Sequence, residues 1–89
     1  MSPSARLAPG QQEAHIRREK KGRGGKTVTV IYNLRLAPAE LKVLGRHLRQ
    51  LCGTGGTVKE GTIELQGDHR EKVAEALQLI GYRFKFTGG

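Results

Sequence analysis

A run of basic residues early in the chain has the composition and spacing of a polyanion-binding loop. Six cations fall within ten residues around a glycine-rich stretch, and they form the basic run: Arg17, Arg18, Lys20, Lys21, Arg23 and Lys26. A flexible loop with this charge density can follow a phosphate backbone, and each phosphate contact releases counterions. The run therefore predicts affinity for a polyanion. A solvated basic tail is the alternative interpretation.

A second basic group falls on one side of a predicted helix. Lys42, Arg46 and Arg49 are spaced by four and three residues, so a helix places them in one row, the helix stripe. Glu40 is the only acidic residue of the same helical segment. A surface helix stabilised by salt bridges usually carries more acidic residues between its cations. The helix stripe therefore predicts a second contact with an anionic partner. A solvated polar face is again the alternative.

A third group, the GDHR block at residues 67–70, lies where a second helix is predicted to begin. Asp68 is a favourable N-cap residue, and Glu71 three positions later completes a capping box. His69 and Arg70 then project from the first helical turn, where a partner can reach them. Two interpretations stay open: the block only caps the helix, or it also belongs to a functional surface.

Residues suited to catalysis or metal binding are scarce. Residues 56–62 have the glycine spacing of a phosphate-binding loop, but Thr62 stands where that loop requires lysine. Cys52 falls on the apolar side of its helix and His47 does not, so Cys52 is predicted to be a small buried hydrophobe. The three histidines lack metal-ligand spacing. We therefore predict no catalytic residues, no cofactor and no metal.

The composition of the whole chain limits the class of protein. The 89 residues carry 16 Lys and Arg against 8 Asp and Glu, for a net charge of +8, and suffice for one domain with one core. One cysteine excludes an intrachain disulfide, and no apolar run approaches the length of a membrane span. The first residues lack the apolar region of a secretory signal. We expect a cytoplasmic monomer with an acidic partner and no membrane contact.

The elements that must position these groups alternate between strands and helices. A flexible segment is expected over residues 1–14, and the folded domain over 15–89. Apolar periodicity and turn residues predict, in order, strands at 15–22 and 26–34, a helix at 38–52, strands at 57–59 and 62–66, a helix at 69–80 and a strand at 82–87. This order predicts the α+β class, as a two-layer α/β sandwich with two helices on one face of a four- to five-stranded, mainly antiparallel sheet.

The same periodicity predicts the core. Its helical members are Leu41, Leu44, Leu48, Leu51, Cys52, Val73, Ala76, Leu77 and Ile80. The open face of the sheet is expected to expose Thr27, Thr29, Glu64, Arg83 and Lys85. Tyr82, Phe84 and Phe86 alternate with basic residues in the last strand and are assigned to the core. RNA is then expected to be recognised by charge and shape and not by base stacking.

Several motifs, in order, give the chain a family resemblance. They are the basic loop, GKTVTVIYNL, a helix of pattern L-K-x-L-x-x-x-L, the turn GTGGTVK-x-G, the segment IELQGDHR and the ending GYRFKFTGG. Together they cover roughly residues 17–89, about four fifths of the chain. This set resembles the eukaryotic-type translation initiation factor 1 family, in its short prokaryotic YciH-like branch.

The resemblance implies a two-layer α/β domain that binds the small ribosomal subunit near the decoding site and governs start-codon selection. The family's basic loop falls on the basic run, its basic helix surface on the helix stripe, and its G-D-[QH]-R block, linked to start-site stringency, on Asp68, His69 and Arg70 with Gly67 before them. The implied partner is small-subunit rRNA, with initiator tRNA and other initiation factors as further candidates. The alternative function is a general RNA-binding or stress-related translation regulator without a role in codon choice.

Overall fold

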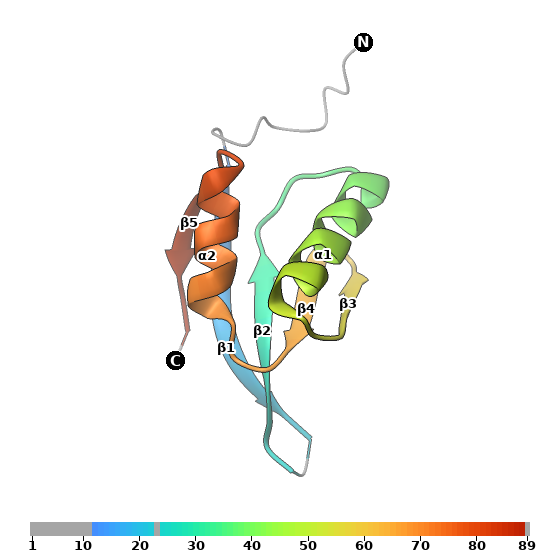
Figure 1. Cartoon of the computed structure of the whole chain (residues 1–89), viewed down its shortest axis with the longest axis vertical. Helices are drawn as coiled ribbons and strands as arrows, with labels where there is room; N and C mark the ends of the chain where they lie inside the picture. The colour runs from blue at the N-terminus through green and yellow to red at the C-terminus, as the bar shows by residue number, and fades with distance from the viewer. Residues whose placement is uncertain (1–11, 23, 89) are drawn as a thin grey trace.

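The computed structural model describes residues 12–22 and 24–88, and strands and helices alternate along them in the predicted order (Figure 1). The elements are β1 (Glu13–Lys21), β2 (Lys26–Tyr32), α1 (Pro38–Cys52), β3 (Gly56–Lys59), β4 (Thr62–Gln66), α2 (Arg70–Leu79) and β5 (Arg83–Phe86). Helix α1 has the predicted bounds. It begins at a proline, which needs no N–H partner there, and it is followed by Gly53, a C-cap residue in the left-handed region.

The strands form one open sheet in the order β3-β4-β2-β1-β5. Neighbours are antiparallel except β1 and β5, which run parallel. Both helices cover the same face of this sheet, and the other face carries no helix among the described residues (Figure 1). The predicted α+β fold with two helices on one face of a five-stranded sheet is therefore confirmed.

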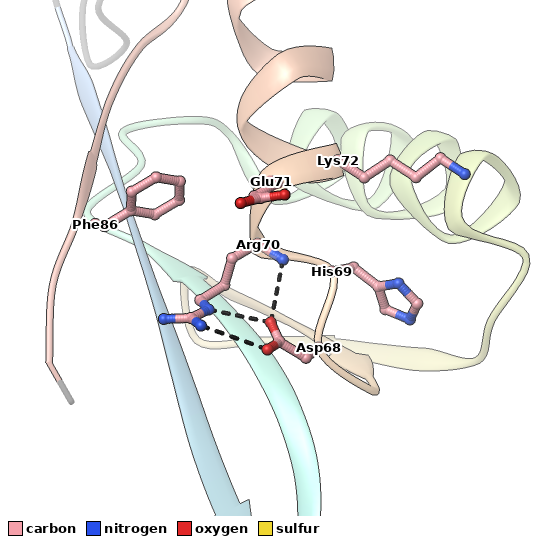
Figure 2. Close-up of a pocket in the computed structure, with 6 residues that line it drawn as sticks. All are labelled: Asp68, His69, Arg70, Glu71, Lys72 and Phe86. Carbon is pink, nitrogen blue, oxygen red and sulfur yellow. Dashed lines mark hydrogen bonds and ion pairs between the residues drawn. The ribbon is translucent and has the colours of Figure 1, made fainter.

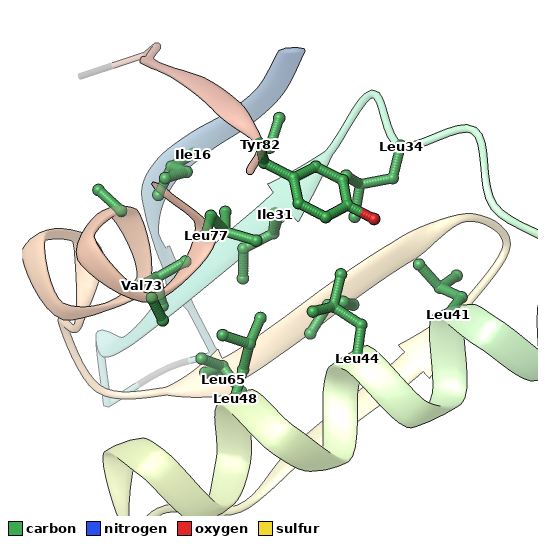
Figure 3. Packing of buried hydrophobic residues seen from close by; sticks show 14 residues of the cluster. Ile16, Ile31, Leu34, Leu41, Leu44, Leu48, Leu65, Val73, Leu77 and Tyr82 are labelled. Atoms are coloured by element: carbon green, nitrogen blue, oxygen red, sulfur yellow. The ribbon is translucent and has the colours of Figure 1, made fainter. Parts of the chain in front are cut away.

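The core lies between the helices and the sheet (Figure 3). Its fully buried large side chains come from both layers: Ile16, Ile31, Leu48, Ile63, Leu65, Leu77 and Val73. Gly45 of α1 faces β3, and a Cβ at this position would collide with the side chain of Val58. The glycine therefore allows α1 to approach the sheet closely.

Several burial predictions fail at the ends of elements. Leu51, Ile80 and Phe86 are exposed, although periodicity assigns them to the core. Each lies in the last turn of a helix, just after one, or at the end of an edge strand. At such positions the opposite layer no longer covers the side chain, and a repeating pattern carries no information about where that cover stops.

The prediction for Thr29 fails in the opposite direction, because this residue is fully buried and does not lie on the open face. Its strand register places it opposite Leu65, and two residues along β2 Ile31 lies opposite Ile63. Leu65, Ile63 and Ile31 all belong to the core, so the odd-numbered residues of this part of β2 face the helices. Val30 lies on the open face but is also buried, so burial does not alternate from residue to residue along this part of β2.

The chain joins the sheet earlier than predicted. Strand β1 begins at Glu13, and Ala14 is fully buried opposite Phe84 of β5. The buried side chain of Gln12 accepts a hydrogen bond from the backbone N–H of Arg35 at 2.8 Å. Residues 12–14 therefore belong to the folded domain. The rest of the predicted flexible segment, residues 1–11, lies outside the described residues.

Candidate nucleic-acid interface

The basic run lies on the β1–β2 hairpin, which extends beyond both helices (Figure 1). Lys21 and Lys26 form the last pair of the ladder, and the turn is closed by a hydrogen bond from the Gly25 N–H to the Gly22 carbonyl at 3.1 Å. Both glycines have positive φ angles, which this turn requires. Arg23 lies outside the described residues.

Strand alternation divides the basic run between two faces. Arg17 and Lys21 lie on the open face of the sheet, because Arg17 stands opposite Val30. Arg18 and Lys20 lie on the face that carries the helices, since Arg18 stands opposite Thr29. Adjacent cations in the sequence therefore cannot all meet one phosphate backbone along a single surface.

The open-face cations already have acidic partners. Arg17 contacts Glu19 at 2.6 Å, and its guanidinium lies 5.1 Å from the ring centroid of Tyr32. Lys21 donates a hydrogen bond to Glu64 at 2.7 Å, which raises the pKa of the Lys21 ammonium group. These acidic partners offset part of the charge that the two cations offer to a phosphate. Lys20 and Lys26 form no ion pair with any described residue, so their charge is available.

The helix stripe lies on the side of α1 that faces β3. Lys42 borders a hollow together with Val58 and Gly61, and Arg46 and Arg49 border another of about 580 Å³ with residues 53–55. Lys42 and Arg46 are exposed, whereas Arg49 is half-buried against Gly56. No described carboxylate forms an ion pair with the helix stripe, so its three charges are available to an anionic partner.

Asp68 is not the N-cap residue of α2, and the predicted capping box is wrong. The helix begins at Arg70, His69 occupies the N-cap position, and no side chain caps the helix there. The carboxylate of Asp68 accepts hydrogen bonds from the backbone N–H of Arg70, the first residue of α2, at 3.5 Å and from Arg70 Nε at 3.0 Å, both drawn in Figure 2. It also accepts one from Arg18 Nη1 at 3.4 Å. The hydrogen bond from the Arg70 side chain is the main reason that the pKa of Asp68 is lowered.

Thr29 fixes the backbone of the GDHR block. Its hydroxyl donates to the Gly67 carbonyl at 2.7 Å and accepts the N–H of His69 at 2.8 Å. The Gly67 N–H in turn donates to the carbonyl of Thr27 at 2.8 Å. Gly67 has a φ angle of 95°, and a side chain there would press on the His69 ring. Sequence reasoning missed Thr29, because nothing in a β-branched strand distinguishes this threonine from its neighbours.

The GDHR block borders a hollow of about 600 Å³ at the start of α2. Asp68, His69 and Arg70 contribute to its wall, together with Glu71, Lys72 and Phe86 (Figure 2). The ion pair between Arg18 and Asp68 joins the block to the basic run. The helix stripe lies apart from both, toward β3 at the opposite edge of the sheet from β5.

The described residues show little sign of other chemistry. Cys52 is half-buried against the core, and this burial raises the pKa of its thiol, so the thiol is a weak nucleophile at neutral pH. No three His, Cys, Asp or Glu side chains gather among the described residues to hold a metal ion. Within the same part of the chain, neither helix is long and apolar enough to cross a bilayer.

These features define a small, basic α+β domain with cations available to an anionic partner at two separate places. Comparison with known proteins gives the family. The model of the family described as translation initiation factor SUI1 matches residues 10–83 of the chain. The chain therefore belongs to the SUI1 family of translation initiation factors, as its motifs predicted.

Relatives occur in bacteria and archaea. An uncharacterized protein of Synechocystis sp. is 45% identical over 83 residues, which are 93% of this chain and 75% of the relative. The YciH protein of Salmonella typhimurium is 41% identical over 80 residues, 90% of this chain and 74% of its own. A protein translation factor SUI1 homolog of Methanocaldococcus jannaschii is 50% identical over 62 residues, 70% of this chain and 60% of its own.

Proposed function

We propose that this protein is a non-catalytic initiation factor that binds rRNA of the small ribosomal subunit and influences the choice of start codon and initiator tRNA. Membership in the SUI1 family supports a role in initiation. The observation that carries the RNA contact is the set of exposed cations without a described acidic partner, on the hairpin and on α1: Lys20, Lys26, Lys42 and Arg46. We further propose that the protein acts as a cytoplasmic monomer, with other initiation factors as possible partners on the subunit.

Two separated basic surfaces orient the protein on its RNA. The hairpin reaches beyond the helices, while the helix stripe lies near β3 (Figure 1). Phosphate contacts at both places release counterions and fix one orientation on the subunit without reading sequence. When both basic surfaces are bound, the RNA segment that contacts the hairpin also lies near the GDHR block. The reason is that Arg18 of β1 donates a hydrogen bond to Asp68.

The GDHR block supplies the discriminating element in this proposal. Asp68 is an exposed carboxylate among cations, and the hydrogen bond from the Arg70 side chain lowers its pKa below the ordinary value. A phosphate that approaches in the wrong geometry meets this negative charge, and such repulsion is how many interfaces achieve specificity. Arg18 and Arg70 attract a phosphate that avoids it. The block therefore favours one arrangement of codon and initiator tRNA over another.

The test combines subunit binding with start-codon discrimination. Small subunits are titrated with the full chain at several salt concentrations, and toeprinting compares cognate with near-cognate start codons. We expect Lys42→Gln/Arg46→Gln to weaken binding and Arg83→Gln/Lys85→Gln to change it little. The second pair lies on β5, which pairs with the end of β1 away from the hairpin turn and is at the opposite edge of the sheet from β3. Equal losses in both variants would contradict a specific interface. Binding without any effect on discrimination would favour the general RNA-binding alternative.

A further inference from the structure

Phe86 is an aromatic side chain that the fold leaves partly uncovered. Strand register places it opposite Ile16, so both point toward the helical side of the sheet. Ile16 is fully buried, whereas Phe86 is 47% exposed, because it lies at the end of an edge strand. Phe84 packs against the core, and its ring centroid lies 5.4 Å from that of Phe86. Phe86 is therefore supported from one side and accessible from another.

The accessible part of Phe86 borders the hollow at the start of α2. Figure 2 shows its ring beside Arg70, with Glu71 and Asp68 on the same side of α2. The hollow of about 600 Å³ falls within the range of sites that hold small organic groups. Its wall combines an aromatic ring, two carboxylates and the cations Arg70 and Lys72.

This combination suits a nucleobase better than a phosphate. Asp68 and Glu71 would repel a phosphate inside the hollow. Asp68 already accepts hydrogen bonds from Arg70 and Arg18, whereas the oxygens of Glu71 can accept hydrogen bonds from the amino and imino groups of a base. A base is flat and neutral, and unpaired bases in RNA stack on aromatic side chains and on guanidinium planes. Arg18, Arg70 and Lys72 then meet the flanking phosphates at the margin of the hollow.

We propose that this hollow binds one unpaired base of the RNA partner, stacked on Phe86 and hydrogen-bonded to Glu71. The proposal rests on the proposed function for the presence of RNA. It adds base stacking to the recognition by charge and shape that the sequence led us to expect. It also assigns a role to an aromatic residue that periodicity placed in the core.

The chain contains no tryptophan, so a Phe86→Trp variant carries a single tryptophan, placed in the hollow, whose emission can be followed. Leu79→Trp is the matched control, because Leu79 is 82% exposed at the other end of α2. Circular dichroism first verifies that both variants are folded. Both are then titrated with a single-stranded oligoribonucleotide and with the same sequence as a duplex, while the anisotropy of labelled RNA measures binding independently. We expect quenching in Phe86→Trp by single strands only, and none in Leu79→Trp.

Each other outcome has a definite meaning. Single-strand binding by anisotropy with unchanged Phe86→Trp fluorescence overturns this inference and leaves the proposed function intact. Equal quenching in the two variants, or equal quenching by duplex and single strand, overturns it as well. If the unaltered chain binds neither RNA nor small subunits, the proposed function fails, and the base site fails with it.

A second variant separates stacking from apolar contact. Phe86→Leu keeps an apolar side chain and removes the aromatic face, so affinity for single strands should fall about 5- to 140-fold, the range expected for one stacked base. The slope of log affinity against log salt should stay the same, because no phosphate contact is lost. Leu79→Ala serves as the control and should change neither quantity. Unchanged affinity in Phe86→Leu would overturn the proposal.

Discussion

The basic run and the helix stripe both carry cations suited to RNA, but the two regions differ in the partners those cations already have. On the hairpin, Arg17 and Lys21 pair with Glu19 and Glu64 across the open face. On α1, no described carboxylate pairs with the helix stripe. A cation that is already paired gains less from a phosphate, because it must give up an existing partner. Charge density along a sequence therefore overstates the charge that a fold makes available.

The largest expected effect tests which face of α1 is buried and which is exposed. Leu48 lies on the buried face of α1 and is fully buried, so Leu48→Ala should lower the free energy of unfolding by about 2–5 kcal/mol. Arg46→Ala should change it by about 0.5 kcal/mol or less, because Arg46 is exposed. Urea denaturation of the two variants measures both values. If Arg46→Ala were the more destabilising, the assigned faces of α1 would be wrong.

The difference between the two basic regions is itself measurable as a salt dependence. Replacing all three residues of the helix stripe by glutamine should make the slope of log affinity against log salt shallower by about 2–3, if each contacts one phosphate. Replacing Arg17 and Lys21 should change the slope by less per residue, because Glu19 and Glu64 already neutralise them. Titrations of small subunits at several salt concentrations give both slopes. Equal changes per residue would remove the distinction between the regions.

A smaller effect is expected at Thr29, which holds the GDHR block beside the hairpin. Thr29→Val keeps the shape but leaves the Gly67 carbonyl and the His69 N–H without their partner, at a cost of about 1–3 kcal/mol. Thr29→Ser retains the hydroxyl and should preserve the block. Hydrogen exchange at the His69 amide should accelerate in Thr29→Val and not in Thr29→Ser. Equal protection in both would contradict a positioning role for the hydroxyl.

The smallest effect concerns the ion pairs that join the block to the hairpin. The pKa of Asp68 is lowered in the folded chain, so its contribution to stability is present above the ordinary pKa of 3.8 and is lost as pH falls through the lowered value. Because Asp68 is exposed, this contribution should be no more than about 0.5 kcal/mol. Thermal denaturation between pH 2 and 6 should show a slightly weaker pH dependence for Asp68→Asn. A stronger dependence in that variant would contradict the assignment.

Much of the fold could be predicted because its signals are local. The bounds of α1 follow from Pro38 at its start and from Gly53, which adopts a φ angle of 64° just after its end. The turn between β3 and β4 follows from Glu60 and Gly61, which both take the positive φ angles of a two-residue hairpin turn. These preferences belong to single residues and their neighbours in the chain, so no knowledge of distant packing is needed.

The sequence by itself determined the order of elements, most of the core and the family, since periodicity, turn residues and motifs are all written along the chain. Only the tertiary structure decided the contact of Asp68 with Arg18, the burial of Thr29 and the exposure of Phe86. Arg18 lies 50 positions before Asp68, and Thr29 lies 40 before His69. Such contacts depend on strand order and on where one layer stops covering the other. These properties arise from the packing of whole elements, and no local pattern encodes them.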